Sequence, residues 1–149
     1  MAITRPLAQT FAMIAQAASN AMDEWWLIGS AAVVLQGGEV RHVRDVDLMM
    51  SARDADAFLA RVGGKRGGPA PSQQFQSDVF GTWSEPPLPV EIFGGFRLFR
   101  DGTWQEVAFA TRERRTVGGA EVYVPSVEEL VRLLHAFGRP KDLERARLL

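Results

Sequence analysis

The sequence predicts an α/β or α+β domain in which helices flank a mixed β-sheet. Three observations predict this class. Helical and strand patterns alternate through the first half of the chain, several short strands follow, and two helical patterns end the sequence. That order of elements is typical of helices packed on a mixed sheet. A chain of 149 residues is the size of one domain. We therefore expect residues 1–149 to form a single domain.

The first half supplies three helices and two strands. Pro6 suits the first turn of a helix over 6–20, whose apolar residues recur at helical spacing; polar residues interrupt this stretch, which favours a helix over a secretory signal. The remaining elements are a strand over 25–28, a helix over 31–36 capped by Ser30, a strand over 45–50 and a helix over 52–62 capped by Ser51. The glycines and prolines of 63–71 predict a loop.

The second half supplies short strands and then two helices. The strands are expected over 75–83, 89–93, 104–109 and 121–124, with a turn at Gly118 and Gly119. Ser126 is expected to cap a helix over 127–137, and a last helix is expected over 141–149.

Composition excludes several classes of protein. Seventeen basic and eighteen acidic residues give a net charge of −1, which argues against a domain that mainly coats nucleic acid. The chain has no cysteine, so disulfides and thiolate metal sites are excluded. No apolar run approaches the roughly 20 residues that cross a bilayer. We expect a cytoplasmic protein with no membrane span.

The first candidate feature is the turn formed by Gly29 and Ser30. A strand that ends in Gly-Ser and enters a helix presents free backbone N–H groups to an anion such as phosphate. Gly29 allows a ligand to approach the backbone, and the Ser30 hydroxyl can donate to the same phosphate. A Gly-Ser pair is also an ordinary turn and helix cap, so the turn alone leaves both interpretations open.

The second feature is a pair of aspartates on a strand, Asp45 and Asp47. Side chains two residues apart on a strand share one face, where two carboxylates can bind a divalent cation. Asp54 and Asp56 have the same spacing but fall on a predicted helix, where their side chains point apart. We interpret that second pair as solvated surface charge and as negative charge near the N-terminus of that helix.

Glu91 interrupts an otherwise apolar strand and is a candidate third carboxylate. A lone acid in a buried strand is costly unless it is paired or binds a metal. The alternative is that Glu91 faces solvent at a sheet edge. If its strand lies beside the strand over 45–50, all three acids converge.

These residues resemble the nucleotidyltransferase superfamily with its polymerase-β-like core, in which a Gly-Ser motif and a helix precede Asp-x-Asp on the next strand. The tail over 125–143, which includes Arg139-Pro140-Lys141-Asp142, looks like the closing part of a bacterial subgroup that includes toxins of the abortive-infection type. The resemblance implies that Asp45, Asp47 and Glu91 bind Mg²⁺ or Mn²⁺ and act in catalysis. It also implies that Gly29 and Ser30 hold a nucleoside triphosphate (NTP).

Two basic residues are candidates for the same nucleotide. The resemblance implies that Lys141 neutralises phosphate charge, although a solvated lysine at a helix start is an equal alternative. Arg44 lies in a basic loop with Arg41 and His42 that either attracts a triphosphate or is simply solvated.

The resemblance implies transfer of a nucleoside monophosphate from an NTP to a hydroxyl acceptor, which is a protein, an RNA or a small molecule. The alternative is a catalytically inactive relative that binds nucleotide or a protein partner, for example within a toxin–antitoxin pair. The two hypotheses differ over Glu91, because only a catalyst needs that side chain beside the ion held by the aspartates.

Overall fold

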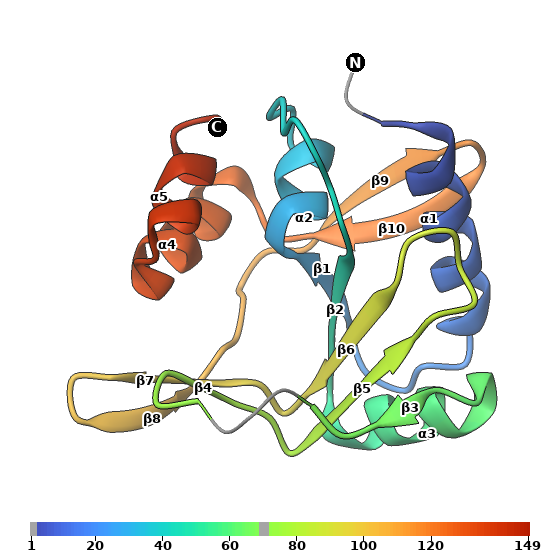
Figure 1. The fold of residues 1–149 in the computed structure, drawn as a ribbon, viewed down its shortest axis with the longest axis horizontal. Coiled ribbons are helices and arrows are strands. Elements are labelled where there is room, and N and C mark those ends of the chain that lie inside the picture. The colour runs from blue at the N-terminus through green and yellow to red at the C-terminus, as the bar shows by residue number, and fades with distance from the viewer. Residues whose placement is uncertain (1–2, 69–71) are drawn as a thin grey trace.

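A computed structural model describes residues 3–68 and 72–149 of the chain (Figure 1). These residues form five helices and ten strands. The helices and strand regions predicted from the sequence are present in the expected order, and several short strands are additional. The result is a mixed α+β fold with a mixed sheet, as expected. None of the helices in the described part has the length and apolar character that a bilayer span requires.

The central sheet has five strands in the order β1-β2-β6-β5-β3. These are β1 (Trp26–Ile28), β2 (Val46–Met50), β6 (Val90–Gly94), β5 (Val79–Trp83) and β3 (Lys65–Arg66). Strands β2 and β6 run parallel to each other, and every other neighbouring pair is antiparallel. The sheet is therefore mixed, and its one parallel pair lies at the centre.

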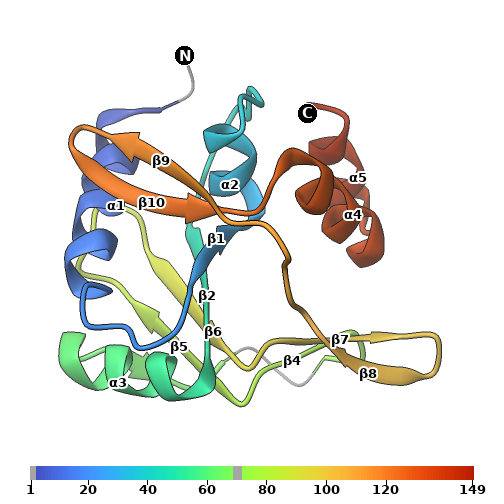
Figure 2. The same cartoon turned by 180° about the vertical axis from the view of Figure 1, so that it is seen from behind.

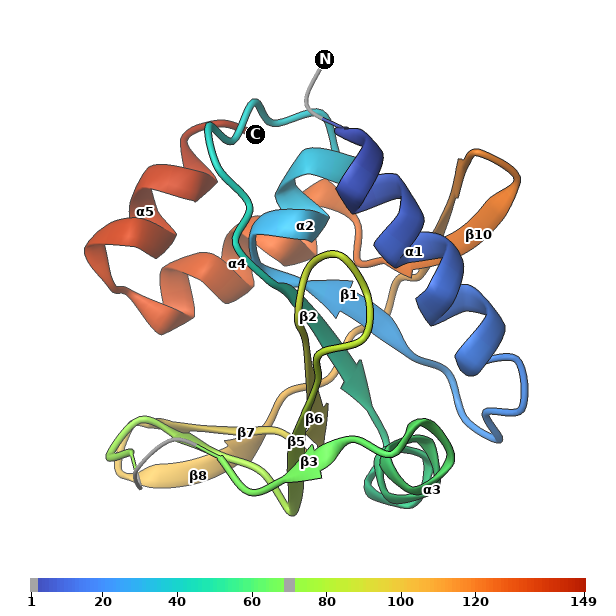
Figure 3. The ribbon, with the colours of Figure 1, turned by 45° about the vertical axis from the view of Figure 1, so that its right-hand side comes forward.

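Helices cover both sides of this sheet. They are α1 (Arg5–Ala17), α2 (Gly29–Leu35), α3 (Ala52–Val62), α4 (Val127–Phe137) and α5 (Pro140–Ala146). Figure 3 shows α1 and α3 on one side of the strands and the α4–α5 hairpin on the other. Ser51 and Ser126 accept hydrogen bonds from backbone N–H groups at the starts of α3 and α4, which confirms two predicted caps.

Two smaller sheets complete the fold. Strands β9 (Glu113–Val117) and β10 (Ala120–Val124) form a hairpin around the turn predicted at Gly118 and Gly119, and β10 packs against α1 (Figure 2). Strands β4 (Phe75–Gln76), β7 (Arg97–Arg100) and β8 (Thr103–Glu106) form a three-stranded arm.

The alternation of side chains along the strands divides the apolar residues into two clusters. Val46, Leu48 and Ile92 join the larger cluster with α1 and α3. The opposite face carries a smaller cluster that includes Met49 of β2 and Phe137 of α4. Because side chains alternate along a strand, Asp47 shares the face of Met49 and not the face of the main core.

Some predicted boundaries are wrong. The strand expected over 75–83 is two strands in different sheets, β4 and β5. Ser30 does not cap a helix, because α2 already begins at Gly29 and Ile28 occupies the cap position without a side-chain hydrogen bond. Strands β3, β7 and β9 were not predicted. Of the predicted loop over 63–71, positions 69–71 lie outside the described residues.

Candidate active site

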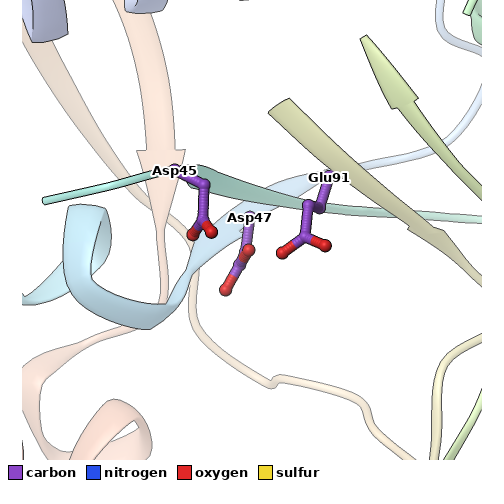
Figure 4. A group of neighbouring side chains, drawn as sticks. All are labelled: Asp45, Asp47 and Glu91. Atoms are coloured by element: carbon purple, nitrogen blue, oxygen red, sulfur yellow. The ribbon is translucent and has the colours of Figure 1, made fainter. Parts of the chain in front are cut away.

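The three acids predicted from the sequence lie together on one face of the central sheet. Asp47 of β2 is directly opposite Glu91 of β6 in the parallel register, and Asp45 immediately precedes β2. One carboxylate oxygen from each acid lies within 4.8 Å of the others (Figure 4). Glu91 does not sit at a sheet edge, because β6 lies between β2 and β5. The expected convergence of the three carboxylates is therefore correct.

Burial and mutual repulsion dominate the electrostatics of this cluster. Burial is the largest cause of a pKa of Asp47 well above its ordinary value of 3.8, and the charges of Asp45 and Glu91 raise it further. Burial also raises the pKa of Glu91 above 4.5, and the charge of Asp45 adds to this. A cluster of this kind is destabilised by its own charge and gains free energy from any cation that neutralises it.

One oxygen of Asp47 lacks the partner that a buried polar atom normally has. Its Oδ1 is buried and accepts no hydrogen bond from the described residues. Unpaired buried oxygens are rare in folded proteins, and each calls for an explanation such as an ion or a water molecule. Three carboxylates are the hard oxygen donors that Mg²⁺ and Mn²⁺ prefer. The donor set therefore fits a divalent metal ion.

The glycine-serine turn lies against this cluster. Gly29 has a φ of +69°, and a Cβ added there would lie 2.5 Å from Oδ2 of Asp47. Only glycine fits both the backbone conformation and the space. Ser30 follows in the first turn of α2 and is buried. The turn and the Asp-x-Asp strand meet because β1 pairs with β2, with Ile28 opposite Asp47.

Two cations of α5 act on the acids. The charge of Lys141 lowers the pKa of Glu91, and the charge of Arg145 lowers the pKa of Asp47, each opposing the effect of burial. Lys141 was a candidate from the sequence, but Arg145 was not. The sequence contained a signal for Arg145: it follows Lys141 by four positions on a predicted helix, and residues four apart lie on the same face of a helix. Arg44 is exposed in the loop before β2, and it is not among the cations that act on these two acids.

The start of α5 is fixed by the residues that surround Lys141. Asp142 is 1% exposed and accepts hydrogen bonds from the backbone N–H and the guanidinium of Arg139. The guanidinium of Arg139 also lies over the rings of Phe75 and Phe137, at 4.9 and 5.7 Å from their centroids. These contacts hold the helix in place, so Lys141 and Arg145 are carried by an ordered element.

Asp54 and Asp56, the second pair of aspartates with the same spacing, differ from each other in the structure. Asp56 is exposed and pairs with Arg66, as expected of surface charge. Asp54 is only 5% exposed and accepts hydrogen bonds from the backbone N–H groups of Met22 and Asp23. Asp54 does lie in the first turn of α3, as expected. Its interpretation as solvated charge is wrong, because the buried side chain fixes the loop before β1.

Comparisons with known proteins agree with this geometry. The family model for aminoglycoside-2″-adenylyltransferases matches residues 11–66, which include Gly29, Ser30, Asp45 and Asp47. No curated protein sequence matches the chain.

Solved structures provide the wider comparison. A candidate nucleotidyltransferase from Thermotoga maritima is 25% identical with a TM-score of 0.77, over 98% of this chain and 94% of that one. The lincosamide antibiotic adenylyltransferase LnuA, solved with lincomycin, is 16% identical with a TM-score of 0.61, over 99% and 96%. ANT(2″)-Ia, solved with adenylyl-2″-tobramycin, is 16% identical with a TM-score of 0.57, over 91% and 82%.

The last two structures, at 16% identity, support the fold alone. The first has the higher identity, 25%, and the higher TM-score. The narrower abortive-infection subgroup stays a prediction. The chain has the nucleotidyltransferase fold and fits the nucleotidyltransferase superfamily.

Proposed function

We propose that this protein transfers a nucleoside monophosphate from an NTP to a hydroxyl acceptor, with a divalent metal ion held by Asp45, Asp47 and Glu91. The observation that carries the proposal is the convergence of three carboxylate oxygens within 4.8 Å beside the glycine-serine turn. Three clustered acids are unfavourable on their own, so the cluster is better explained by a bound cation than by stability.

Mg²⁺ or Mn²⁺ bound by these three acids would neutralise phosphate charge. Oδ1 of Asp47 is the first expected ligand atom, because it is buried and accepts no hydrogen bond from the described residues. Carboxylates of Asp45 and Glu91 complete the protein's share of the site. Magnesium sites of this type normally retain water and substrate oxygens as the remaining ligands.

The phosphate-binding groups surround the acids. The turn at Gly29 and Ser30 offers backbone N–H groups and a hydroxyl beside Asp47. Lys141 of α5 supplies a positive charge near Glu91. We include Arg44 as a weaker candidate, because it is exposed and directly precedes Asp45.

The proposed reaction is an in-line displacement at the α-phosphorus. The acceptor oxygen forms a bond to the α-phosphorus, the bond from that phosphorus to the bridging oxygen breaks, and pyrophosphate leaves. Glu91 accepts the proton of the acceptor hydroxyl, because its carboxylate lies beside those of Asp45 and Asp47 at the proposed metal site. The catalytic contribution of the chain is then positioning and charge neutralisation.

The alternative of an inactive binding relative predicts nucleotide binding without transfer. The position of Glu91 beside Asp47 favours the enzyme, since a binding module has no need of a third carboxylate there. A cytoplasmic location and a partner in a toxin–antitoxin pair stay predictions from the sequence.

The first test is calorimetric titration of ATP, GTP, CTP and UTP, with and without Mg²⁺. The wild type is compared with Asp45→Asn/Asp47→Asn and with the control Asp56→Asn, which removes an exposed aspartate of α3. We expect magnesium-dependent binding of at least one nucleotide, loss of that binding in the double variant, and no change in the control.

A second measurement separates the two functions. Radiolabel from the α-phosphate of the bound nucleotide is followed into hydroxyl-containing acceptors, for the wild type and for Glu91→Gln. Transfer that disappears in Glu91→Gln supports the enzyme. Absence of nucleotide binding to the folded wild type contradicts both the enzyme and the nucleotide-binding alternative.

A further inference from the structure

The register of the central sheet aligns five residues in one row across five strands. Ile28 of β1 lies opposite Asp47 of β2, Asp47 opposite Glu91 of β6, Glu91 opposite Thr82 of β5, and Thr82 opposite Lys65 of β3. Directly opposite residues in neighbouring strands share one face of a sheet. The row of acids therefore continues into a hydroxyl and then into an ammonium group at the sheet edge.

Neighbouring residues confirm which face this row occupies. Gly81 lies against Leu59 of α3, and Trp83 packs on Phe58 of α3. Thr82, between them, therefore points to the opposite face, which carries Glu91. Arg66 pairs with Asp56 of α3, so its neighbour Lys65 also points away from α3. Thr82 and Lys65 thus lie on the same face as the three carboxylates.

Lys65 is available for an external partner. Its side chain is exposed, and the ion pairs found among the described residues do not include it. Neighbouring strands are about 4.8 Å apart, so Lys65 and Glu91 are separated by roughly 10 Å at the backbone. A lysine has a long flexible stem. Its ammonium can therefore contact a ligand that lies over Thr82 with a hydroxyl at Glu91.

The row has two chemically different ends. The Asp47 end lies against the turn at Gly29, where the NTP is expected. The Glu91 end continues to Thr82 and Lys65, with no carboxylate beyond Glu91 in the row. Because Glu91 is the acid proposed to take the proton of the acceptor, the acceptor is expected on this second end.

We propose that Thr82 and Lys65 form the acceptor subsite, and that it takes a hydroxyl compound carrying an anionic group, such as a phosphate or a carboxylate, close to the reacting hydroxyl. This inference rests on the proposed function and names the substrate class. Lys65 pairs with the anionic group, and the Thr82 hydroxyl hydrogen-bonds to the acceptor beside Glu91.

The subsite argues against a polycationic acceptor. An aminoglycoside such as tobramycin carries several ammonium groups, which need carboxylates as partners, whereas an additional ammonium from Lys65 repels them. The similarity to the aminoglycoside adenylyltransferase family over 11–66 does not cover Thr82. It includes Lys65, so it covers one of the two residues of the proposed subsite.

The test measures binding of three probes to the protein saturated with Mg²⁺ and a non-hydrolysable analogue of its preferred NTP. Ribose 5-phosphate, ribose and tobramycin are anionic, neutral and cationic hydroxyl compounds. We expect ribose 5-phosphate to bind at least about tenfold more tightly than ribose, as one charge-assisted hydrogen bond allows, and tobramycin to bind least.

The matched variants are Lys65→Ala and Arg66→Ala, adjacent residues of β3 that point to opposite faces. Lys65→Ala is expected to abolish the preference for ribose 5-phosphate while nucleotide affinity stays unchanged. Arg66→Ala is expected to retain the preference. Equal binding of the probes, no binding of any probe, or a preference that survives Lys65→Ala overturns the acceptor subsite. Loss of the proposed function itself is recognised separately, as the absence of magnesium-dependent nucleotide binding before any probe is added.

Discussion

The carboxylate of Asp47 packs so closely against Gly29 that a Cβ added to Gly29 would lie 2.5 Å from Oδ2 of Asp47. The sequence pattern explains Gly29 by the approach of a ligand to the backbone. The structure adds a second reason, which is the space that the carboxylate of Asp47 occupies. The backbone geometry of the turn at Gly29 and the position of the Asp47 carboxylate therefore depend on each other.

We predict that Gly29→Ala reduces magnesium-dependent nucleotide affinity by at least about tenfold, because the new methyl group displaces Asp47. The φ of +69° adds about 1 kcal/mol of backbone strain. Gly63→Ala is the matched control, since Gly63 has a φ of +66° and nothing within 4 Å of an added Cβ. Both variants are compared by urea unfolding and by calorimetry. A similar loss of nucleotide affinity in Gly63→Ala would contradict the role of the contact with Asp47.

Asp47→Asn is predicted to stabilise the metal-free protein. The substitution removes a buried charge that is repelled by Asp45 and Glu91, while the shape of the side chain is retained. We expect an increase of about 1 kcal/mol in the free energy of unfolding, which is the typical size of a single-site effect. Mg²⁺ should stabilise the wild type and leave this variant unchanged. Urea unfolding with EDTA and with Mg²⁺ measures both effects, and destabilisation of the metal-free protein would refute this account of the cluster.

The contribution of Asp47 and Glu91 to the stability of the metal-free protein is predicted to become more favourable as the pH falls. The folded-state pKa values of Asp47 and Glu91 are raised above the ordinary values of 3.8 and 4.5, so the folded protein binds protons that the unfolded chain has released. Between the raised and the ordinary values, acidification therefore favours folding, and the gain is complete below the ordinary values.

Metal binding has the opposite pH dependence, because only the deprotonated carboxylates are ligands. Magnesium-dependent nucleotide affinity should fall with acidification, beginning above the ordinary carboxyl range. Thermal unfolding with EDTA and calorimetry with Mg²⁺, each over a pH series, test the two trends. A double variant, Asp47→Asn/Glu91→Gln, should remove the stability gain.

Much of the fold was predictable because its signals are local. The caps at Ser51 and Ser126 and the turn at Gly118 and Gly119 were identified from the sequence and are confirmed. The three acids were also identified, since their spacing on short strands is a local property. Their convergence also requires that β2 pairs with β6. The sequence does not specify this pairing, so the convergence could only be predicted on the condition that the two strands are neighbours.

The remaining features depend on contacts distant in sequence. The opposition of Lys65, Thr82 and Glu91 is a matter of register between strands, and no local pattern specifies it. Strand β3 has only two residues, which is too short for a periodic signal. Asp54 is buried because the loop before β1, about 30 positions away, folds over it. The periodicity of a helix indicates which side chains share a face, and not which loop covers them.

Asp54→Ala is predicted to destabilise the fold without affecting the metal site. Its carboxylate accepts hydrogen bonds from the N–H groups of Met22 and Asp23, and its removal leaves these groups unpaired. The expected cost is about 1 to 3 kcal/mol, as for other buried polar groups that lose a partner. The control Asp56→Ala, at an exposed ion pair, is expected to cost less than about 1 kcal/mol. Equal costs in urea unfolding would contradict the structural role of Asp54.

Arg145→Ala is predicted to shift the pH dependence of nucleotide binding to higher pH. The charge of Arg145 lowers the pKa of Asp47, so its loss raises that pKa further and makes the metal ligand protonate at higher pH. At neutral pH we expect a three- to tenfold loss of magnesium-dependent nucleotide affinity, roughly the effect of one partly screened charge. The measurement is calorimetric titration over a pH series.

Arg147→Ala is the control for this last prediction. Arg147 is an exposed residue at the end of α5, two positions from Arg145, and its charge is not among those acting on Asp47 or Glu91. The two variants have the same net charge, so an effect of overall charge would appear in both. If the pH dependence of nucleotide affinity shifts only in Arg145→Ala, the effect comes from the face of α5 that carries Lys141. Equal shifts in both variants would contradict the prediction, because they would show an effect of net charge alone.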